Sequence, residues 1–156
     1  MKIIYNCYGG SHSSVLSGYI HCGIIEKDKV PSAKKLLSLA YYDSQKADDH
    51  GIVQYIGTDS KGNRVYSVGL ESEAVFSRKC VKNIAAIMGI SCEEYVFVDT
   101  MPAVNWFMRI GGFLSRALGL KAVGRPLVIF GTQRAFFDII NLVEDNINKI
   151  EESDKK

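Results

Sequence analysis

The sequence predicts a three-layer α/β fold, with a mainly parallel sheet, helices on both of its faces and one β-hairpin. Apolar, β-rich stretches alternate with stretches whose apolar residues recur at helical spacing. That alternation is the pattern of strands joined by crossover helices. One pair of β-rich runs is instead separated by a tight turn, which predicts the hairpin. Because neither an internal repeat nor a linker-like segment interrupts the sequence, we expect one domain over residues 1–150 and a solvated tail over 151–156.

The first half of the chain is expected to hold one strand, two helices and the hairpin. The apolar, partly β-branched run at residues 3–6 predicts a buried strand. Apolar residues at helical spacing predict a helix over 13–25. Pro31 suits the first turn of a second helix that continues to Tyr42. The two runs in "IVQYIGTDSKGNRVYSVGL" flank a turn containing Gly62, which predicts the hairpin.

The second half is expected to alternate between helices and strands. We predict a helix over residues 71–88, a strand over 94–100, a helix over 102–118, a strand over 127–131 and a helix over 134–150. Gly89 ends the first of these helices. Gly111 and Gly112 lie in the middle of the second one, where they allow close packing or a kink.

Composition and charge exclude several classes of protein. Charged residues make up 23% of the chain, and the formal net charge is +2 with scattered Lys and Arg, which argues against a nucleic-acid partner. The longest charge-poor stretch, residues 95–108, is too short and too interrupted by Asp99 and Pro102 to span a membrane. Four cysteines without a CxxC pair or a preceding signal peptide predict a cytoplasmic protein with reduced thiols.

Three loops are expected at the carboxyl ends of strands, where open α/β sheets bind ligands. They cover residues 7–14, 99–102 and 131–134. Each carries polar residues directly after an apolar run, and this coincidence predicts a site. The third loop contributes Thr132, Gln133 and Arg134 as candidate anion-binding residues, with surface capping as the alternative role for them.

The first loop has the composition of an anion-binding loop. Gly9 and Gly10 let backbone N–H groups point inward, and the helix that follows presents its positive end. The same field favours a thiolate at Cys7. Hydroxyl donors come from Ser11, Ser13 and Ser14. The alternative is an ordinary strand–turn–helix, in which a serine caps the helix and Cys7 is a small core residue.

This loop resembles two kinds of cysteine phosphate loop and differs from a Walker A loop, because the GxxxxGK[ST] pattern is absent. Low-molecular-weight tyrosine phosphatases and arsenate reductases carry C-x5-R-S after their first strand. Cys7 and Ser14 match the cysteine and the serine, but Ser13 stands where the arginine belongs. The loop is also similar to that of IIB proteins of sugar phosphotransferase systems, which lacks the arginine. Cys7, Gly10, Ser13 and Ser14 match that loop in spacing.

Over most of its length the chain resembles one further family. The stretches "IIYNCYGGSHSSV", "YIGTDSKGNRVYSVG", "VDTMPAVNWFMRIGGFLSR" and "GRPLVIFGTQRA" are similar to an uncharacterised bacterial family known only as a domain of unknown function. The resemblance runs from Met1 to about Leu142. It implies a single domain and supplies no activity.

Two further residues are candidates for acid–base chemistry. His12 lies inside the first loop, where it could be a general acid–base, an anion ligand or a phosphate acceptor. The alternative is a helix-start residue that faces solvent. Asp99 follows a strand and lies near Pro102, as the general acid does in phosphatases that the cysteine loop resembles. Its alternatives are a Mg²⁺ ligand near a phosphate and a helix cap.

The remaining candidates are expected to be structural. Arg125 precedes the predicted last strand, so we place it at the opposite end of the sheet. His21 and Cys22 lie about 13 Å from His12 at helical rise, and without zinc-type spacing we expect no metal site. The aromatic residues most simply fill core or form a subunit contact, which makes a homodimer through the aromatic helix an expected partner. They are Trp106, Phe107, Phe113, Phe136 and Phe137.

Together these observations predict an enzyme that binds a phosphate-bearing small molecule at residues 7–14. In its sharper form, Cys7 is the nucleophile of a phosphatase or phosphotransferase-like reaction, the loop holds the oxyanion, and His12 or Asp99 handles the proton. No cofactor is expected, with Mg²⁺ as the exception noted for Asp99. Two alternatives stay open: a non-catalytic sensor of a nucleotide or phosphometabolite with a protein partner, and a thiol carrier of sulfur or selenium.

Overall fold

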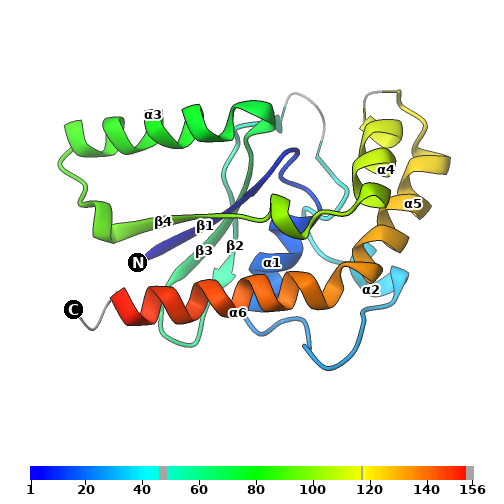
Figure 1. The fold of residues 1–156 in the computed structure, drawn as a ribbon, viewed down its shortest axis with the longest axis horizontal. Coiled ribbons are helices and arrows are strands. Elements are labelled where there is room, and N and C mark those ends of the chain that lie inside the picture. Colours follow the sequence, from blue (N-terminus) through cyan, green and yellow to red (C-terminus); the bar gives the residue numbers. More distant parts are fainter. Residues whose placement is uncertain (46–48, 117, 154–156) are drawn as a thin grey trace.

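The structure is a computed structural model that describes residues 1–45, 49–116 and 118–153. Its described strands are β1 (Lys2–Cys7), β2 (Gln54–Thr58), β3 (Arg64–Gly69) and β4 (Tyr95–Asp99), in the order β2-β3-β1-β4 (Figure 1). β1 pairs in parallel with β3 and β4, whereas β2 and β3 are antiparallel. The mainly parallel sheet and the hairpin are therefore confirmed.

Pairing in the sheet brings three strand ends to one edge. Cys7 lies opposite Gly69, and Asn6 lies opposite Asp99. The carboxyl ends of β1, β3 and β4 consequently meet, and the loops that leave them are neighbours. The first loop is therefore at the centre of this edge.

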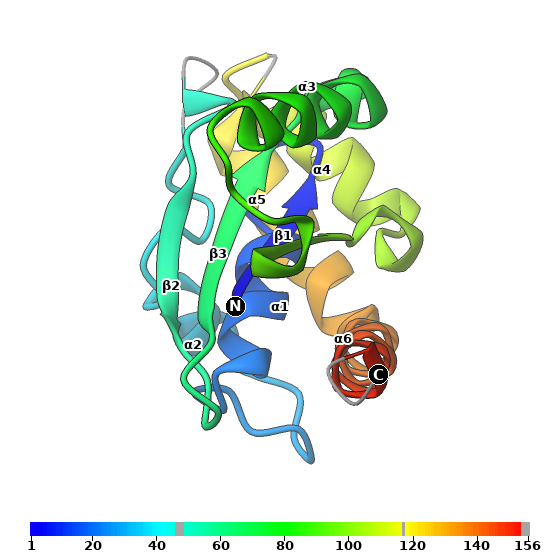
Figure 2. The same cartoon turned by 90° about the vertical axis from the view of Figure 1, so that its left-hand side faces the viewer.

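Helices surround the sheet unevenly. The α-helices are α1 (Ser13–His21), α2 (Ala33–Leu37), α3 (Ala74–Ile87), α4 (Trp106–Arg116), α5 (Lys121–Arg134) and α6 (Phe136–Ser153), and short 3₁₀ turns cover Glu71–Glu73, Cys92–Glu94 and Met101–Ala103. α1 contacts β1, β2 and β3, and α6 packs against α1. α3 runs along the other side of the sheet (Figures 1 and 2).

The main core lies between the sheet, α1 and α6. Its fully buried side chains include Tyr5 of β1, Leu16 of α1 and Phe136 of α6. On the opposite side, α3 keeps most of its apolar residues exposed, and Ile87 is 86% exposed. One helical layer is thus well packed, and the predicted three complete layers are not confirmed.

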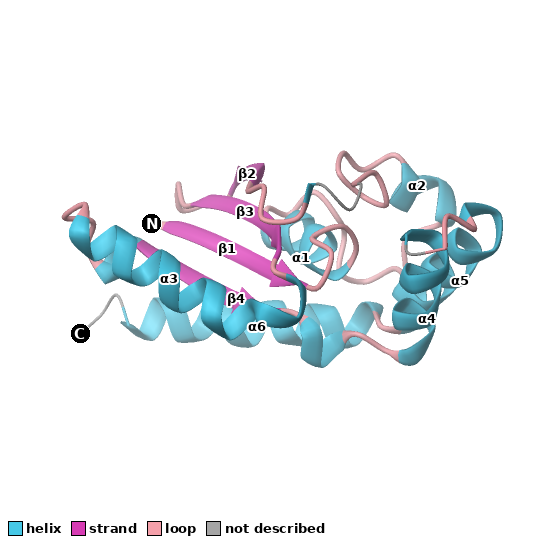
Figure 3. Cartoon of the chain, turned by 90° about the horizontal axis from the view of Figure 1, so that it is seen from above, coloured by secondary structure: helices cyan, strands magenta, loops and turns pink. Residues whose placement is uncertain are grey.

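The predicted strand over residues 127–131 is wrong, because this segment lies inside α5. α5 packs side by side with α4 at the end of the molecule away from both termini (Figure 3). Glycines permit this close approach: a Cβ on Gly124 would lie 2.5 Å from the backbone nitrogen of Ser115, and one on Gly111 would lie 2.7 Å from that of Val128. Close packing at Gly111 is confirmed, whereas Gly112 faces open space.

Several predicted boundaries also shift. The helix expected over 102–118 is divided into a 3₁₀ turn and α4, because the Asn105 side chain accepts a hydrogen bond from the Met108 N–H (3.0 Å) and starts a new helix. The second helix shortens to α2, which Ser32 caps. α6 continues to Ser153, so the predicted tail begins later, and residues 154–156 lie outside the described residues.

The length and apolar content of the described helices decide whether one of them could span a membrane. None is long and apolar enough to cross a membrane alone, although α5 and α6, bent by 57°, pass the same test as a pair by length and composition.

Candidate functional site

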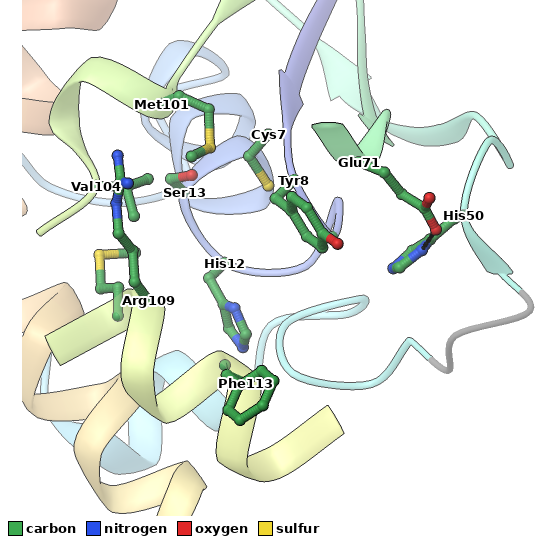
Figure 4. Close-up of a pocket in the computed structure, with 13 residues that line it drawn as sticks. Cys7, Tyr8, His12, Ser13, His50, Glu71, Met101, Val104, Arg109 and Phe113 are labelled. Carbon is green, nitrogen blue, oxygen red and sulfur yellow. Dashed lines mark hydrogen bonds and ion pairs between the residues drawn. The ribbon is translucent and has the colours of Figure 1, made fainter. Parts of the chain in front are cut away.

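A cavity of about 520 Å³ opens in front of the first loop at the carboxyl edge of the sheet (Figure 4). The first loop supplies one side, the segment from the β4 end into α4 supplies another, and the loops that flank β2 and β3 supply a third. Its lining residues are Cys7, Tyr8, Gly9, His12, Ser13, His50, Glu71, Met101, Val104, Met108, Arg109, Gly112 and Phe113. The volume is in the range of small-molecule sites.

The Cys7 thiol is surrounded by hydrogen-bond donors. The Gly10 N–H points at Sγ from 3.1 Å, and the Ser14 hydroxyl lies 3.1 Å from it. Burial raises the pKa of Cys7, but hydrogen bonds from the side chain and backbone of Ser14, from the Ser13 hydroxyl and from the Ser11 N–H outweigh it. The pKa of Cys7 therefore lies below its ordinary value.

The direction of the hydrogen bonds behind Cys7 favours a thiolate. The Ser67 hydroxyl of β3 has two acceptors, the Ser14 oxygen (2.9 Å) and the Gly10 carbonyl (3.3 Å). Donation over the shorter distance leaves the Ser14 proton for the Cys7 sulfur. All three groups are buried, and Ser14 and Ser67 are fully so. A chain of hydroxyls in a low-dielectric interior stabilises negative charge at its end. Ser67 of β3 is therefore part of the site, although it lies outside the first loop.

Glycines fix the shape of the loop. Gly10 has a φ of +63°, which favours glycine, and a Cβ there would lie 2.3 Å from the Gly69 backbone nitrogen. Gly69 in turn faces the Gly9 backbone, where a Cβ would lie 2.7 Å from its carbonyl carbon. The loop therefore packs backbone to backbone on the end of β3, which turns the Gly10 N–H toward the thiol.

The start of α1 adds further donors. Its N-cap residue, His12, makes no side-chain capping bond, so the first N–H groups of the helix are not capped by that side chain. Ser13 and Thr100 lie 2.8 Å apart through their hydroxyls, and Thr100 also donates to the Asn6 carbonyl (3.0 Å). The Ser11 hydroxyl turns away toward the Tyr41 carbonyl, so Ser11 contributes its backbone. The N–H groups at the start of α1 can hold an oxyanion beside the thiol.

His12 is held in place by a buried carboxylate. Its Nε2 lies 3.1 Å from Asp43 Oδ1, and Arg125 of α5 donates to Asp43 Oδ2 (2.6 Å). Burial raises the pKa of Asp43, but the bonds from His12 and Arg125 outweigh it and lower the pKa to about 2. Because an ionised carboxylate only accepts, we assign the proton to Nε2 of His12. The ring also lines the cavity.

The structure corrects the expected place of Arg125. It lies in α5 and faces the site side of the molecule through Asp43, whereas the strand prediction put it at the opposite end of the sheet. Arg125 has a structural role, because it orients Asp43, and Asp43 in turn orients His12.

Asp99 is not brought to Cys7. Neighbouring strand residues point to opposite faces, so Asn6 and its partner Asp99 face α3 while Cys7 faces α1. Asp99 accepts hydrogen bonds from Asn6 Nδ2 (3.3 Å) and from the Met101 N–H (3.0 Å), and it lies 3.6 Å from Arg78 of α3. These contacts describe a cap and an ion pair outside the cavity. Thr100, the next residue, reaches the site instead.

Thr132, Gln133 and Arg134 also lie away from the cavity. With residues 127–131 in a helix, they form the end of α5 and follow no strand. Thr132 accepts from the Tyr42 hydroxyl (2.7 Å), Gln133 donates to the Pro31 carbonyl (2.9 Å), and Arg134 lies over the Phe130 ring. The contacts of Thr132 and Gln133 hold α5 against the segment around α2, and that of Arg134 stays within α5.

Sequence reasoning missed a second imidazole–carboxylate pair in the cavity. His50 Nδ1 forms a short hydrogen bond with Glu71, whose φ of +50° is unusual for a residue with a side chain. His50 Nε2 is buried without a partner among the described residues.

Asp43, Ser67 and Thr100 were missed as well, because each comes from a different segment and only the folded chain brings them together. Among the described residues, no group of three or more His, Cys, Asp or Glu could hold a metal ion.

With the geometry known, the chain can be compared with other proteins. A family model described as a protein of unknown function (DUF3189) matches residues 2–147. The chain belongs to the DUF3189 family. This confirms the resemblance to an uncharacterised family seen in the sequence. No curated protein and no solved structure matches the chain. Membership of DUF3189 therefore leaves the chemistry to be argued from the cavity.

Proposed function

We propose that the protein is an enzyme that acts on a phosphorylated small molecule through the thiolate of Cys7. The observation that carries the proposal is the set of donors around Sγ: the Gly10 N–H, the Ser14 hydroxyl and the start of α1. Donors arranged in this way stabilise negative charge on sulfur and on an oxyanion in contact with it. The cavity in front of the thiol gives a ligand access.

The proposed reaction has two steps. The thiolate attacks phosphorus, so that an S–P bond forms as the P–O bond to the leaving alcohol breaks. The leaving oxygen takes the Nδ1 proton of a doubly protonated His12, whose Nε2 proton stays in the hydrogen bond to Asp43. A water molecule then attacks the phosphocysteine and returns its proton to His12. The S–P bond breaks, its electron pair returns to sulfur, and orthophosphate leaves. The Asp43 carboxylate beside His12 stabilises the protonated ring in the first step.

The departure from the phosphatase loops shapes this proposal. Ser13 replaces their arginine. Arg109 of α4 is the basic side chain among the lining residues. Binding of the phosphoryl group therefore depends mostly on backbone N–H groups and hydroxyls. Weak phosphate affinity, in the millimolar range, is the expected consequence.

The compartment and the assembly state are proposed on similar grounds. Cys7, Cys22, Cys80 and Cys92 are all free thiols, which supports a reducing, cytoplasmic location. Trp106 of α4 is 75% exposed, which supports a homodimer contact through this helix. Phe136, which was grouped with it, is instead fully buried in the core.

The test is phosphate release from p-nitrophenyl phosphate, with the Cys7 peptide followed by mass spectrometry after acid quenching. We expect release, together with a phosphate-sized mass increase on the Cys7 peptide. Cys7→Ser should abolish both, and Cys22→Ser should change neither. Binding of phosphate without turnover or adduct would favour the sensor, and a sulfur-sized mass increase would favour the thiol carrier. Either of these results would contradict the proposed reaction.

A further inference from the structure

We infer that the substrate of the Cys7 site is a phosphomonoester whose alcohol part is aromatic or branched aliphatic. This inference rests on the proposed function and adds the substrate class. Three features of the cavity carry it: its size, the chemistry of the wall opposite the first loop, and the number of charges along it.

The cavity is much larger than a phosphate ion. One water molecule takes about 30 Å³ in the liquid, and a phosphate ion has only five heavy atoms. Such an ion bound on the first loop would leave most of the 520 Å³ unfilled. The remainder must hold the rest of the substrate or water.

The wall supplied by the β4 end and α4 is mostly apolar, and Arg109 is its charged residue among those described. Met101, Val104, Met108 and Phe113 line it, and Tyr8 adds a second aromatic ring from the first loop. Figure 4 shows Met101, Val104, Phe113 and Tyr8 around the same cavity as Cys7 and His12. Methionine adapts its shape to a bound apolar group and contacts aromatic rings favourably. A ligand that carries an aromatic or branched group on its phosphate would bury that group here.

The same lining argues against two other classes of phosphate ligand. A sugar phosphate presents several hydroxyls, and the Met, Val and Phe side chains of this wall would leave the hydroxyls that face it without hydrogen-bond partners, because the polar groups of His50 and Glu71 lie on another side of the cavity. A nucleoside polyphosphate carries several negative charges, whereas Arg109 is the single Lys or Arg among the lining residues that the structure describes. Glu71 adds a negative charge to the same cavity. A single phosphate group with an apolar substituent fits both the charge and the wall.

The test measures how well three compounds protect Cys7 from alkylation by iodoacetamide in the wild-type protein. The compounds are inorganic phosphate, phenyl phosphate and glycerol 3-phosphate. We expect phenyl phosphate to protect at a concentration at least about tenfold lower than the other two, because burial of its ring adds affinity. Equal or better protection by glycerol 3-phosphate would overturn the inference.

Two variants locate the effect on the wall. Phe113→Ala should weaken protection by phenyl phosphate about tenfold and leave protection by inorganic phosphate unchanged. Phe137→Ala is the matched control, because Phe137 is 53% exposed on α6 and does not line the cavity. Phe137→Ala should change the protecting concentration of neither phenyl phosphate nor inorganic phosphate. If Phe113→Ala leaves phenyl phosphate unaffected, the wall does not bind the substituent. If no compound protects Cys7, the anion site itself is absent and the proposed function fails first.

Discussion

The unit formed by β1 and α1 carries a cysteine and a histidine–aspartate pair at each of its two ends. At the carboxyl edge of the sheet are Cys7 and the pair His12–Asp43. At the opposite edge are Cys22 and the pair His21–Asp59, in which Nε2 of His21 lies 3.1 Å from the carboxylate. The residue types match, yet the two ends differ in chemistry.

The first difference lies in what surrounds each thiol. Hydrogen-bond donors converge on Cys7 and lower its pKa in spite of burial. No donor converges on Cys22 among the described residues, so burial and, to a smaller extent, the Asp59 carboxylate raise its pKa to about 11. A thiol becomes a nucleophile through its donors, and a nearby histidine–aspartate pair does not by itself activate it.

The second difference lies in how each imidazole is enclosed. Both ring nitrogens of His21 are occupied, because Nδ1 lies 2.7 Å from the Tyr5 hydroxyl, and burial lowers the pKa of the ring. Asp59 also holds the hairpin turn through the N–H groups of Lys61 and Asn63. His21 and Asp59 therefore hold the end of α1 to the hairpin turn, and we call this pair the clasp. His12 instead borders a cavity with a thiol in it. A cavity together with an activated group marks the site, and either feature alone does not.

The largest expected effect comes from removing each thiol. Cys7→Ser should lower phosphate release by at least about a thousandfold, because a serine hydroxyl remains protonated at neutral pH. Cys22→Ser should leave the rate unchanged. Rates are measured on both variants at equal folded concentration, checked by circular dichroism. Comparable loss in both variants would show that the two ends do not differ as argued.

The next effect breaks the clasp. Asp59→Ala removes the acceptor of the hairpin turn and leaves the buried Nε2 of His21 without the Asp59 carboxylate. The free energy of unfolding should therefore fall by about 2–4 kcal/mol. Urea denaturation measures this loss. The alkylation rate of Cys7 in the folded variant should stay within about twofold of the wild type. A stable variant with a slower Cys7 would place Asp59 in the active machinery.

A smaller effect separates two serines of α1. Ser14→Ala removes the hydroxyl from Cys7, so the pKa of Cys7 should rise and alkylation at pH 7 should slow up to about tenfold. Ser17 is the matched control, since its hydroxyl is buried without a partner among the described residues. Ser17→Ala should leave the pKa of Cys7 unchanged. Equal effects from the two variants would argue that helix packing, and not the hydrogen bond, sets the pKa.

The ion pairs of Asp43 with His12 and Arg125 should also affect the stability of the fold in acid. The pKa of Asp43 is lowered to about 2 from its ordinary value of 3.8, so its ion pairs stabilise the fold above about pH 4 and are lost as the pH falls from 4 toward 2. Asp43→Asn should flatten the fall in the urea midpoint across this window. An unchanged slope would mean that Asp43 titrates normally in the folded state.

The smallest expected effect concerns Asp99. Asp99→Asn should leave phosphate release within about twofold of the wild type, because Asp99 faces α3 on the side of the sheet away from Cys7. His12→Ala, by contrast, should lower the rate by about a hundredfold. A larger loss for Asp99→Asn than for His12→Ala would restore Asp99 as the general acid.

Local sequence predicted the parts of the molecule that local physics determines. The strand β1, the hairpin and the start of α1 follow from alternation, turn residues and helical spacing, so the loop from Cys7 to Ser14 was recognised. The apolar run at residues 127–131 suits either a buried strand or a helix. Only the close packing of Gly124 against α4 decides for a helix. Tertiary contacts therefore decide between two structures that the local sequence permits.

The same reasoning explains which site residues were found. Cys7, His12 and Ser13 are neighbours in the sequence, so their grouping was visible. Asp43 and Ser67 come from separate segments, and the pairing of β3 with β1 and the packing of α5 bring them in. No spacing rule in the sequence links them. Thr132, Gln133 and Arg134 were assigned to the site only because a strand was expected before them.

The most direct test of the central claim compares Cys7 and Cys22 in one experiment. Alkylation by iodoacetamide is followed for both peptides by mass spectrometry across pH 5 to 10, with and without millimolar phosphate. We predict that Cys7 reacts with a midpoint well below the ordinary thiol pKa of about 8.5 and is protected by phosphate, while Cys22 reacts slowly without protection. A Cys7 that reacts as slowly as Cys22, with no effect of phosphate, would contradict the account.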